Sequence, residues 1–152
     1  MTTTGTLPQG TRTSLTTTAM NSLASATYVS CGTLTHTTND PLDCLIEVKV
    51  TPGTVSGNKQ LVVFCRGSLD GTNFESGPVS GTTTTDEPNL RYVGTIPLNS
   101  NSTAQTRIFS LASAYKGVLP YASEIVVKND SGAALAASGH HVYYAEITAN
   151  SA

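Results

Sequence analysis

Residues 42–50 read Leu-Asp-Cys-Leu-Ile-Glu-Val-Lys-Val, and this stretch decides the fold class. Apolar side chains recur at positions 44, 46, 48 and 50, while Asp43, Glu47 and Lys49 occupy intervening positions. A period of two is typical of a β-strand with one buried face, because successive side chains point to opposite sides of the sheet. The segment therefore predicts a half-buried strand.

A second segment, residues 60–69, carries apolar side chains on both faces. Leu61, Val63 and Cys65 share one face, and Val62 and Phe64 share the other. Such a strand is central in its sheet, or another subunit covers its second face. We therefore predict a homo-oligomer, a dimer or a trimer, with Val62, Phe64 and Tyr144 as interface candidates.

Turn-forming residues separate further strand-like runs along the chain. The predicted strands are 26–34, 42–50, 60–69, 72–76, 90–98, 104–112, 121–128 and 141–148. Asp70-Gly71 predicts a two-residue hairpin turn, and Pro97 predicts an edge position for its strand. The 25 Thr and 16 Ser residues also favour strands and turns. We predict an all-β, antiparallel, jelly-roll-like β-sandwich of about eight strands, with an immunoglobulin-like topology as the alternative.

The first 24 residues differ in composition from the rest of the chain. Runs such as Thr2-Thr3-Thr4 and Thr16-Thr17-Thr18 supply few apolar groups. We predict that residues 1–24 form an extended N-terminal arm, and that residues 25–152 form the jelly-roll domain. Because ordering a polar arm costs entropy, it orders only by lying on another surface; a disordered tail is the alternative.

Charge and hydropathy exclude several classes of partner. The chain has 8 basic and 10 acidic residues, and its formal net charge is −2. The basic residues are scattered, whereas nucleic-acid binding depends on clustered positive charge, so we expect no nucleic-acid partner. No apolar run approaches the ~20 residues of a membrane span, and no secretory signal is recognisable, so we expect no membrane partner.

The three cysteines, Cys31, Cys44 and Cys65, lie in strand-like segments among apolar residues. An odd number cannot pair completely within one chain, and free cysteine often behaves as a small buried hydrophobe. We predict three reduced, buried thiols rather than a disulfide. Reduced thiols are also consistent with a reducing compartment such as a cytoplasm.

The sequence contains no convincing catalytic or ligand-binding constellation. The adjacent residues His140 and His141 open a strand, so their rings are expected on opposite faces, where they cannot easily share a metal. Asp86-Glu87 alone offers too few oxygens for calcium. There is no Trp to stack on a sugar, and the six Tyr residues suit a core or an interface. We expect no catalytic residues, no metal and no cofactor, and we expect that the protein is not an enzyme.

Two blocks of sequence resemble small virion proteins of tailed bacteriophages. The first runs from Leu61-Val62-Val63-Phe64 through Gly67-Ser68-Leu69-Asp70-Gly71-Thr72-Asn73-Phe74. The second comprises Gly117-Val118-Leu119-Pro120, Ile125-Val126-Val127-Lys128-Asn129 and Ser131-Gly132-Ala133-Ala134-Leu135. Within that group the chain most resembles the jelly-roll decoration, or cement, proteins on the outside of phage heads.

The resemblance implies a virion structural protein whose partner is the major capsid protein. Such a protein binds the outer surface of the capsid lattice and stabilises the expanded head. It is located on the capsid surface and assembles in the cytoplasm of the bacterial host. Two alternatives stay open: another virion component, such as a tail, neck or head-fibre subunit, and a jelly-roll module that binds carbohydrate or the host.

Overall fold

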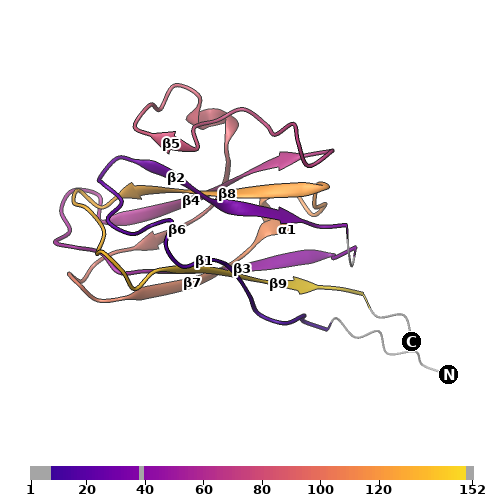
Figure 1. Ribbon diagram of the computed structural model, residues 1–152, viewed down its shortest axis with the longest axis horizontal. Helices are drawn as coiled ribbons and strands as arrows, with labels where there is room; N and C mark the ends of the chain where they lie inside the picture. Colours follow the sequence, from indigo (N-terminus) through magenta and orange to yellow (C-terminus); the bar gives the residue numbers. More distant parts are fainter. Residues whose placement is uncertain (1–7, 38–39, 150–152) are drawn as a thin grey trace.

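The computed structural model describes residues 8–37 and 40–149, which form two antiparallel sheets (Figure 1). The first sheet contains, in spatial order, β1 (Thr13–Thr16), β9 (His141–Ile147), β3 (Asp43–Val50) and β7 (Gln105–Ser110). The second contains β5 (Ser80–Gly81), β2 (Tyr28–Thr35), β8 (Ala122–Asp130), β4 (Gln60–Ser68) and β6 (Arg91–Pro97). The predicted antiparallel β-sandwich is confirmed.

The order of pairing is that of a long hairpin rolled into two layers. β1 pairs with β9, β2 with β8, β3 with β7 and β4 with β6, so the two halves of the chain run side by side. Successive pairs lie alternately in the first and the second sheet. This arrangement is a jelly roll of eight main strands, to which the two-residue β5 is added at one edge.

The core lies between the sheets, and the alternation in β3 places four of its side chains there. Cys44, Ile46, Val48 and Val50 are all completely buried. They pack in one cluster with residues of β4 and β8, including Val63. Each apolar position in β3 therefore lies on the side that the period of two predicts. All three cysteines are free and buried, as predicted.

The N-terminal segment contributes to the sandwich, which corrects the predicted division at residue 24. β1 pairs with β9, and the side chains of Met20 and Leu23 are 1% and 9% exposed within the main core. Two backbone hydrogen bonds also hold this segment, from Ser22 N to Ala136 O (2.9 Å) and from Leu135 N to Leu23 O (3.0 Å). Two well-placed apolar side chains are enough to bury a segment that is otherwise rich in Thr. Residues 1–7 of the predicted arm lie outside the described residues.

A segment of the same chain covers the outer face of the second sheet. Phe64 is 7% exposed and packs with Tyr28, Leu90 and Val126 beneath the segment that carries β5 and the 3-10 turn η1 (Glu87–Asn89). Glu87 ties the segment down, because it accepts hydrogen bonds from the Tyr28 hydroxyl and from Lys128 Nζ, the latter at 2.6 Å. The prediction that β4 buries apolar side chains on both faces is confirmed, but a segment of the same chain covers Phe64.

One further difference from the predicted strands has a local cause. The predicted strand 104–112 ends at Ser110, whose side chain accepts a hydrogen bond from Ser113 N (3.1 Å) and caps the short helix α1 (Leu111–Ala114). The edge position predicted for the strand with Pro97 is confirmed, since β6 ends the second sheet. No helix among the described residues is long and apolar enough to cross a membrane.

Candidate docking surface

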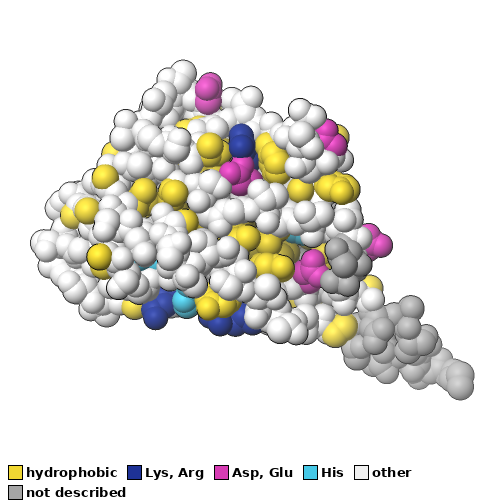
Figure 2. All heavy atoms as spheres, viewed as in Figure 1, with side chains coloured by type: hydrophobic (Ala, Val, Ile, Leu, Met, Phe, Trp, Pro, Cys, Tyr) yellow, Lys and Arg dark blue, Asp and Glu magenta, His cyan; other side chains and the backbone are white. Residues whose placement is uncertain are grey.

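Exposed apolar side chains gather at one end of the sandwich. Six large hydrophobic side chains are exposed in the described part of the chain. Four of them lie in or beside loops that adjoin the end of β2, the end of β4 and the start of β8: Leu42 (51% exposed), Leu69 (88%), Val118 (76%) and Tyr121 (43%). These four residues are called the apolar end below. Figure 2 shows hydrophobic side chains at the surface toward the right, where β2 ends and β8 begins in Figure 1.

The four side chains line two adjoining depressions, which share Pro120, although three loops supply them. Leu42, Val118 and Tyr121 line a depression of about 420 Å³, and Leu69 lines a neighbouring one of about 590 Å³. The Tyr121 ring lies against Gly71, where an added Cβ would be 3.0 Å from ring atom Cε1. The loop after β4 and the loop before β8 are thus packed together.

The turn that displays Leu69 is held by the side chain of Asp70. The Asp70 carboxylate accepts hydrogen bonds from Asn73 N (2.7 Å), Thr72 N (2.8 Å) and Asn73 Nδ2 (2.6 Å). These bonds, first that from the Asn73 backbone, hold the pKa of Asp70 well below its ordinary value. Leu69 is therefore presented on a preformed turn, which lowers the entropy cost of docking.

The same hydrogen bonds correct the predicted hairpin. Asp70 captures the backbone amides that a strand at 72–76 would use, so the return segment makes only an isolated bridge between Ser68 and Phe74. Local bonding of this kind is how Asp competes with a sheet ladder. The result is a wider turn than the two-residue turn expected for Asp70-Gly71.

The depression beside Leu69 has an apolar wall, and the two charged side chains in it form an ion pair with each other. Phe74, Tyr115 and Pro120 line it together with Glu75 and Arg91. Arg91 Nε lies 2.9 Å from Glu75 Oε2, and the hydrogen bond from Arg91 is the main cause that lowers the pKa of Glu75. Since the cation is already paired, the depression suits an apolar side chain better than an anionic ligand.

The one Ser–His contact recorded among the described residues is buried. His36 Nε2 lies 3.0 Å from Ser123 Oγ, but the two residues are only 5% and 0% exposed. Burial lowers the pKa of His36 and so favours the neutral ring. A serine nucleophile needs access to its substrate and a positioned base. The closed setting makes this contact a structural one.

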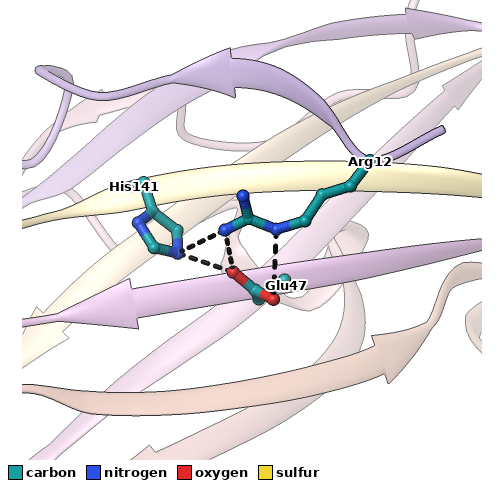
Figure 3. Close-up of polar contacts among 3 residues, drawn as sticks. All are labelled: Arg12, Glu47 and His141. Carbon is teal, nitrogen blue, oxygen red and sulfur yellow. Dashed lines mark hydrogen bonds and ion pairs between the residues drawn. The ribbon is translucent and has the colours of Figure 1, made fainter.

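A charged cluster lies apart from the apolar end, on the outer face of the first sheet (Figure 3). Glu47 of β3 accepts hydrogen bonds from Arg12 and lies 2.7 Å from His141 Nε2 of β9. Arg12 also lies over the Tyr143 ring, 3.6 Å from its centroid. Because Arg12 immediately precedes β1, the cluster fastens the first strand to the sheet.

The two adjacent histidines have separate surroundings. His140 is buried and contacts Ala136 O and Thr51 N, whereas His141 contacts Glu47. No group of three or more His, Cys, Asp or Glu side chains within residues 8–37 and 40–149 is arranged to hold a metal ion.

The structure does not bring the three predicted interface residues together. Val62 and Phe64 belong to the outer face of the second sheet, where Val62 packs against the covered cluster of Phe64. Tyr144 lies in the first sheet and packs against the main core. The residues that sequence reasoning missed are Leu69 and Val118. Their signal was a large apolar residue within a turn, where polar residues are usual.

Comparisons with protein-family models, with curated proteins and with solved structures find no match to this chain.

Proposed function

We propose that this protein is a non-enzymatic virion structural protein that decorates the outer surface of a phage capsid. The observation that carries the proposal is the apolar end, whose side chains line two adjoining depressions and include Leu69 on a preformed turn. The resemblance of residues 61–64, 67–74, 117–120, 125–129 and 131–135 to phage decoration proteins supports the same reading, and these stretches contribute Leu69 and Val118 to that surface.

The partner that fits the apolar end is the major capsid protein in its assembled lattice. Burying an exposed aliphatic or aromatic side chain stabilises a complex by roughly 1.5–3 kcal/mol. Four such side chains roughly offset the cost of association, which is about 4–15 kcal/mol. A single apolar end therefore binds weakly. High occupancy of the capsid requires that each bound oligomer dock through more than one apolar end. Binding only to the expanded lattice stabilises that state by linkage.

The test is a binding curve on undecorated heads. Leu69→Asp and Val118→Asp place a charge at the two most exposed apolar positions, and each is expected to weaken occupancy about tenfold or more. Thr83→Asp is the matched control, since it adds the same charge at an exposed position in the segment over the second sheet. All three variants are expected to keep the wild-type melting temperature.

Equal binding by the two apolar-end variants and by wild type would refute docking through this surface. If the protein did not bind heads but labelled tails or necks in electron micrographs, it would be assigned to that part of the virion instead. Binding of the isolated protein to a glycan array, blocked by Leu69→Asp, would favour a host-recognition module instead.

A further inference from the structure

The two exposed large hydrophobic side chains that remain lie on adjoining edge strands of the two sheets, where they belong to opposite outer faces of the sandwich. Tyr92 (60% exposed) is on β6 and Ile108 (59% exposed) is on β7, the edge strands of the two sheets. Arg107 of β7 donates a hydrogen bond to the backbone oxygen of Thr95 in β6 (2.7 Å), so these edges are neighbours. Ile108 is therefore an exposed apolar side chain on an edge strand, and neither the core nor the apolar end accounts for it.

The four edge strands of the described sheets differ in how well they resist pairing with another chain. β1 has four residues and a bulge, and β5 has two residues. β6 has a bulge opposite Val63 and Phe64 and ends at Pro97. Short strands, bulges and proline are all devices that blunt an edge. β7 has none of them: its six residues pair with β3 in an unbroken register.

The residues of β7 also match themselves when the strand is reversed. In an antiparallel register centred on Ile108, Ile108 meets Ile108, Thr106 meets Ser110 and Arg107 meets Phe109. Opposed residues then lie on the same face of the joined sheet, because the two residue numbers in each pair are both even or both odd. No like charges meet directly, and Arg107 faces an aromatic ring such as the one it already contacts at 5.4 Å within its own chain.

We propose that two copies of this chain form a dimer through β7, related by a two-fold axis at Ile108. The pairing joins two four-stranded sheets into one continuous sheet and buries Ile108 against its counterpart. The surface differs from that predicted from Val62 and Phe64, whose outer face the chain itself covers. Because the axis reverses the strand direction, the two apolar ends point to opposite ends of the dimer, which makes it a bridge between two partners.

The first experiment is analytical ultracentrifugation of the full chain over a range of concentrations. The wild-type protein is expected to be a dimer. Ile108→Lys places two ammonium groups at the axis and removes two apolar side chains, and the dissociation constant is expected to rise roughly 100-fold. Val118→Lys is the matched control, because it makes the same kind of change at the apolar end and is expected to leave the dimer intact.

The second experiment tests the register by cross-linking. Directly opposed residues of antiparallel strands have Cα atoms about 4.5–5.5 Å apart, within the range of a disulfide. Ile108→Cys is therefore expected to form a covalent dimer under mild oxidation. Thr106→Cys is not, since the two copies of that residue would be four positions apart along the strands, about 13 Å. The three native thiols are buried and do not compete.

A monomer at all concentrations, a trimer, or a dimer that Ile108→Lys leaves unchanged would overturn the proposal. Efficient cross-linking of Thr106→Cys in place of Ile108→Cys would overturn the register. None of these outcomes bears on capsid docking, which the Leu69→Asp and Val118→Asp variants test separately; a dimer that binds no head would refute the proposed function and leave the dimer standing.

Discussion

Replacing Met20 by Ala tests whether the N-terminal segment belongs to the folded unit. The Met20 side chain is 1% exposed and packs in the main core with Leu23. Its segment is anchored through hydrogen bonds to residues 135 and 136, so the chain cannot readily move inward to fill the space left by the truncation. Truncations of this kind cost about 2–5 kcal/mol, and we expect about 3 kcal/mol because methionine sites relax in part.

The measurement is chemical denaturation of Met20→Ala beside Thr17→Ala, an exposed position in the same segment. The control is expected to change the free energy of unfolding by less than about 0.5 kcal/mol. A loss of about 3 kcal/mol in Met20→Ala corresponds to a fall of roughly 6–12 °C in melting temperature for a domain of this size. If Met20→Ala were as stable as Thr17→Ala, the segment would be a dispensable arm and the structural argument would fail.

Three further outcomes are expected. The hydrogen bonds to Glu47, mainly from Arg12, lower its pKa in the folded state, so their stabilisation is present above the unfolded pKa near 4.5 and is lost as the pH falls through the folded value. Glu47→Gln should therefore flatten the acid denaturation curve below pH 5, and an unchanged curve would contradict this. Burial raises the pKa of all three thiols to about 12, so a thiol reagent at pH 8 should react slowly with native protein and titrate three groups after denaturation, and two missing groups would reveal a disulfide. Gly94→Ala should cost about 1–3 kcal/mol in urea unfolding, because the Phe109 ring occupies the space of the added methyl group, and a neutral effect would mean that the β6–β7 contact is loose.

Local periodicity predicted the strands well, because alternation along a strand is decided by which face is buried. The strand from Asp43 to Val50 needed only its own residues to be recognised. Tyr92 shows where this reasoning stops: plain alternation would put it on the same face as the buried residues Gly94, Ile96 and Leu98, yet it is 60% exposed. The register shift opposite Val63 and Phe64 inserts a residue into β6 and reverses the parity beyond it.

Contacts between distant segments could not be read from the sequence in the same way. The pairing of β1 with β9 joins residues near 14 to residues near 143, and nothing local to either strand specifies it. The covering of Phe64 likewise depends on Tyr28 and Leu90, which are remote in the chain. At the candidate site, the sequence predicted a turn at Asp70. It could not predict that three loops come together at the apolar end, because their proximity depends on the order of the strands in the sheets.

The rolled-hairpin topology has a consequence for the order in which the chain folds. The pair β4–β6 closes the shortest loop, whereas β1 meets β9 only after some 130 residues have been arranged between them. Loop-closure entropy rises with the length of the loop, and folds dominated by distant pairings reach the native state in about milliseconds to seconds. We therefore expect the β4–β6 pair to form first and the pairing of β1 with β9 to form last. In a newly made chain the β1–β9 pairing is the last to form. The contacts among Arg12, Glu47 and His141 therefore stabilise the sandwich only after the other strands have paired.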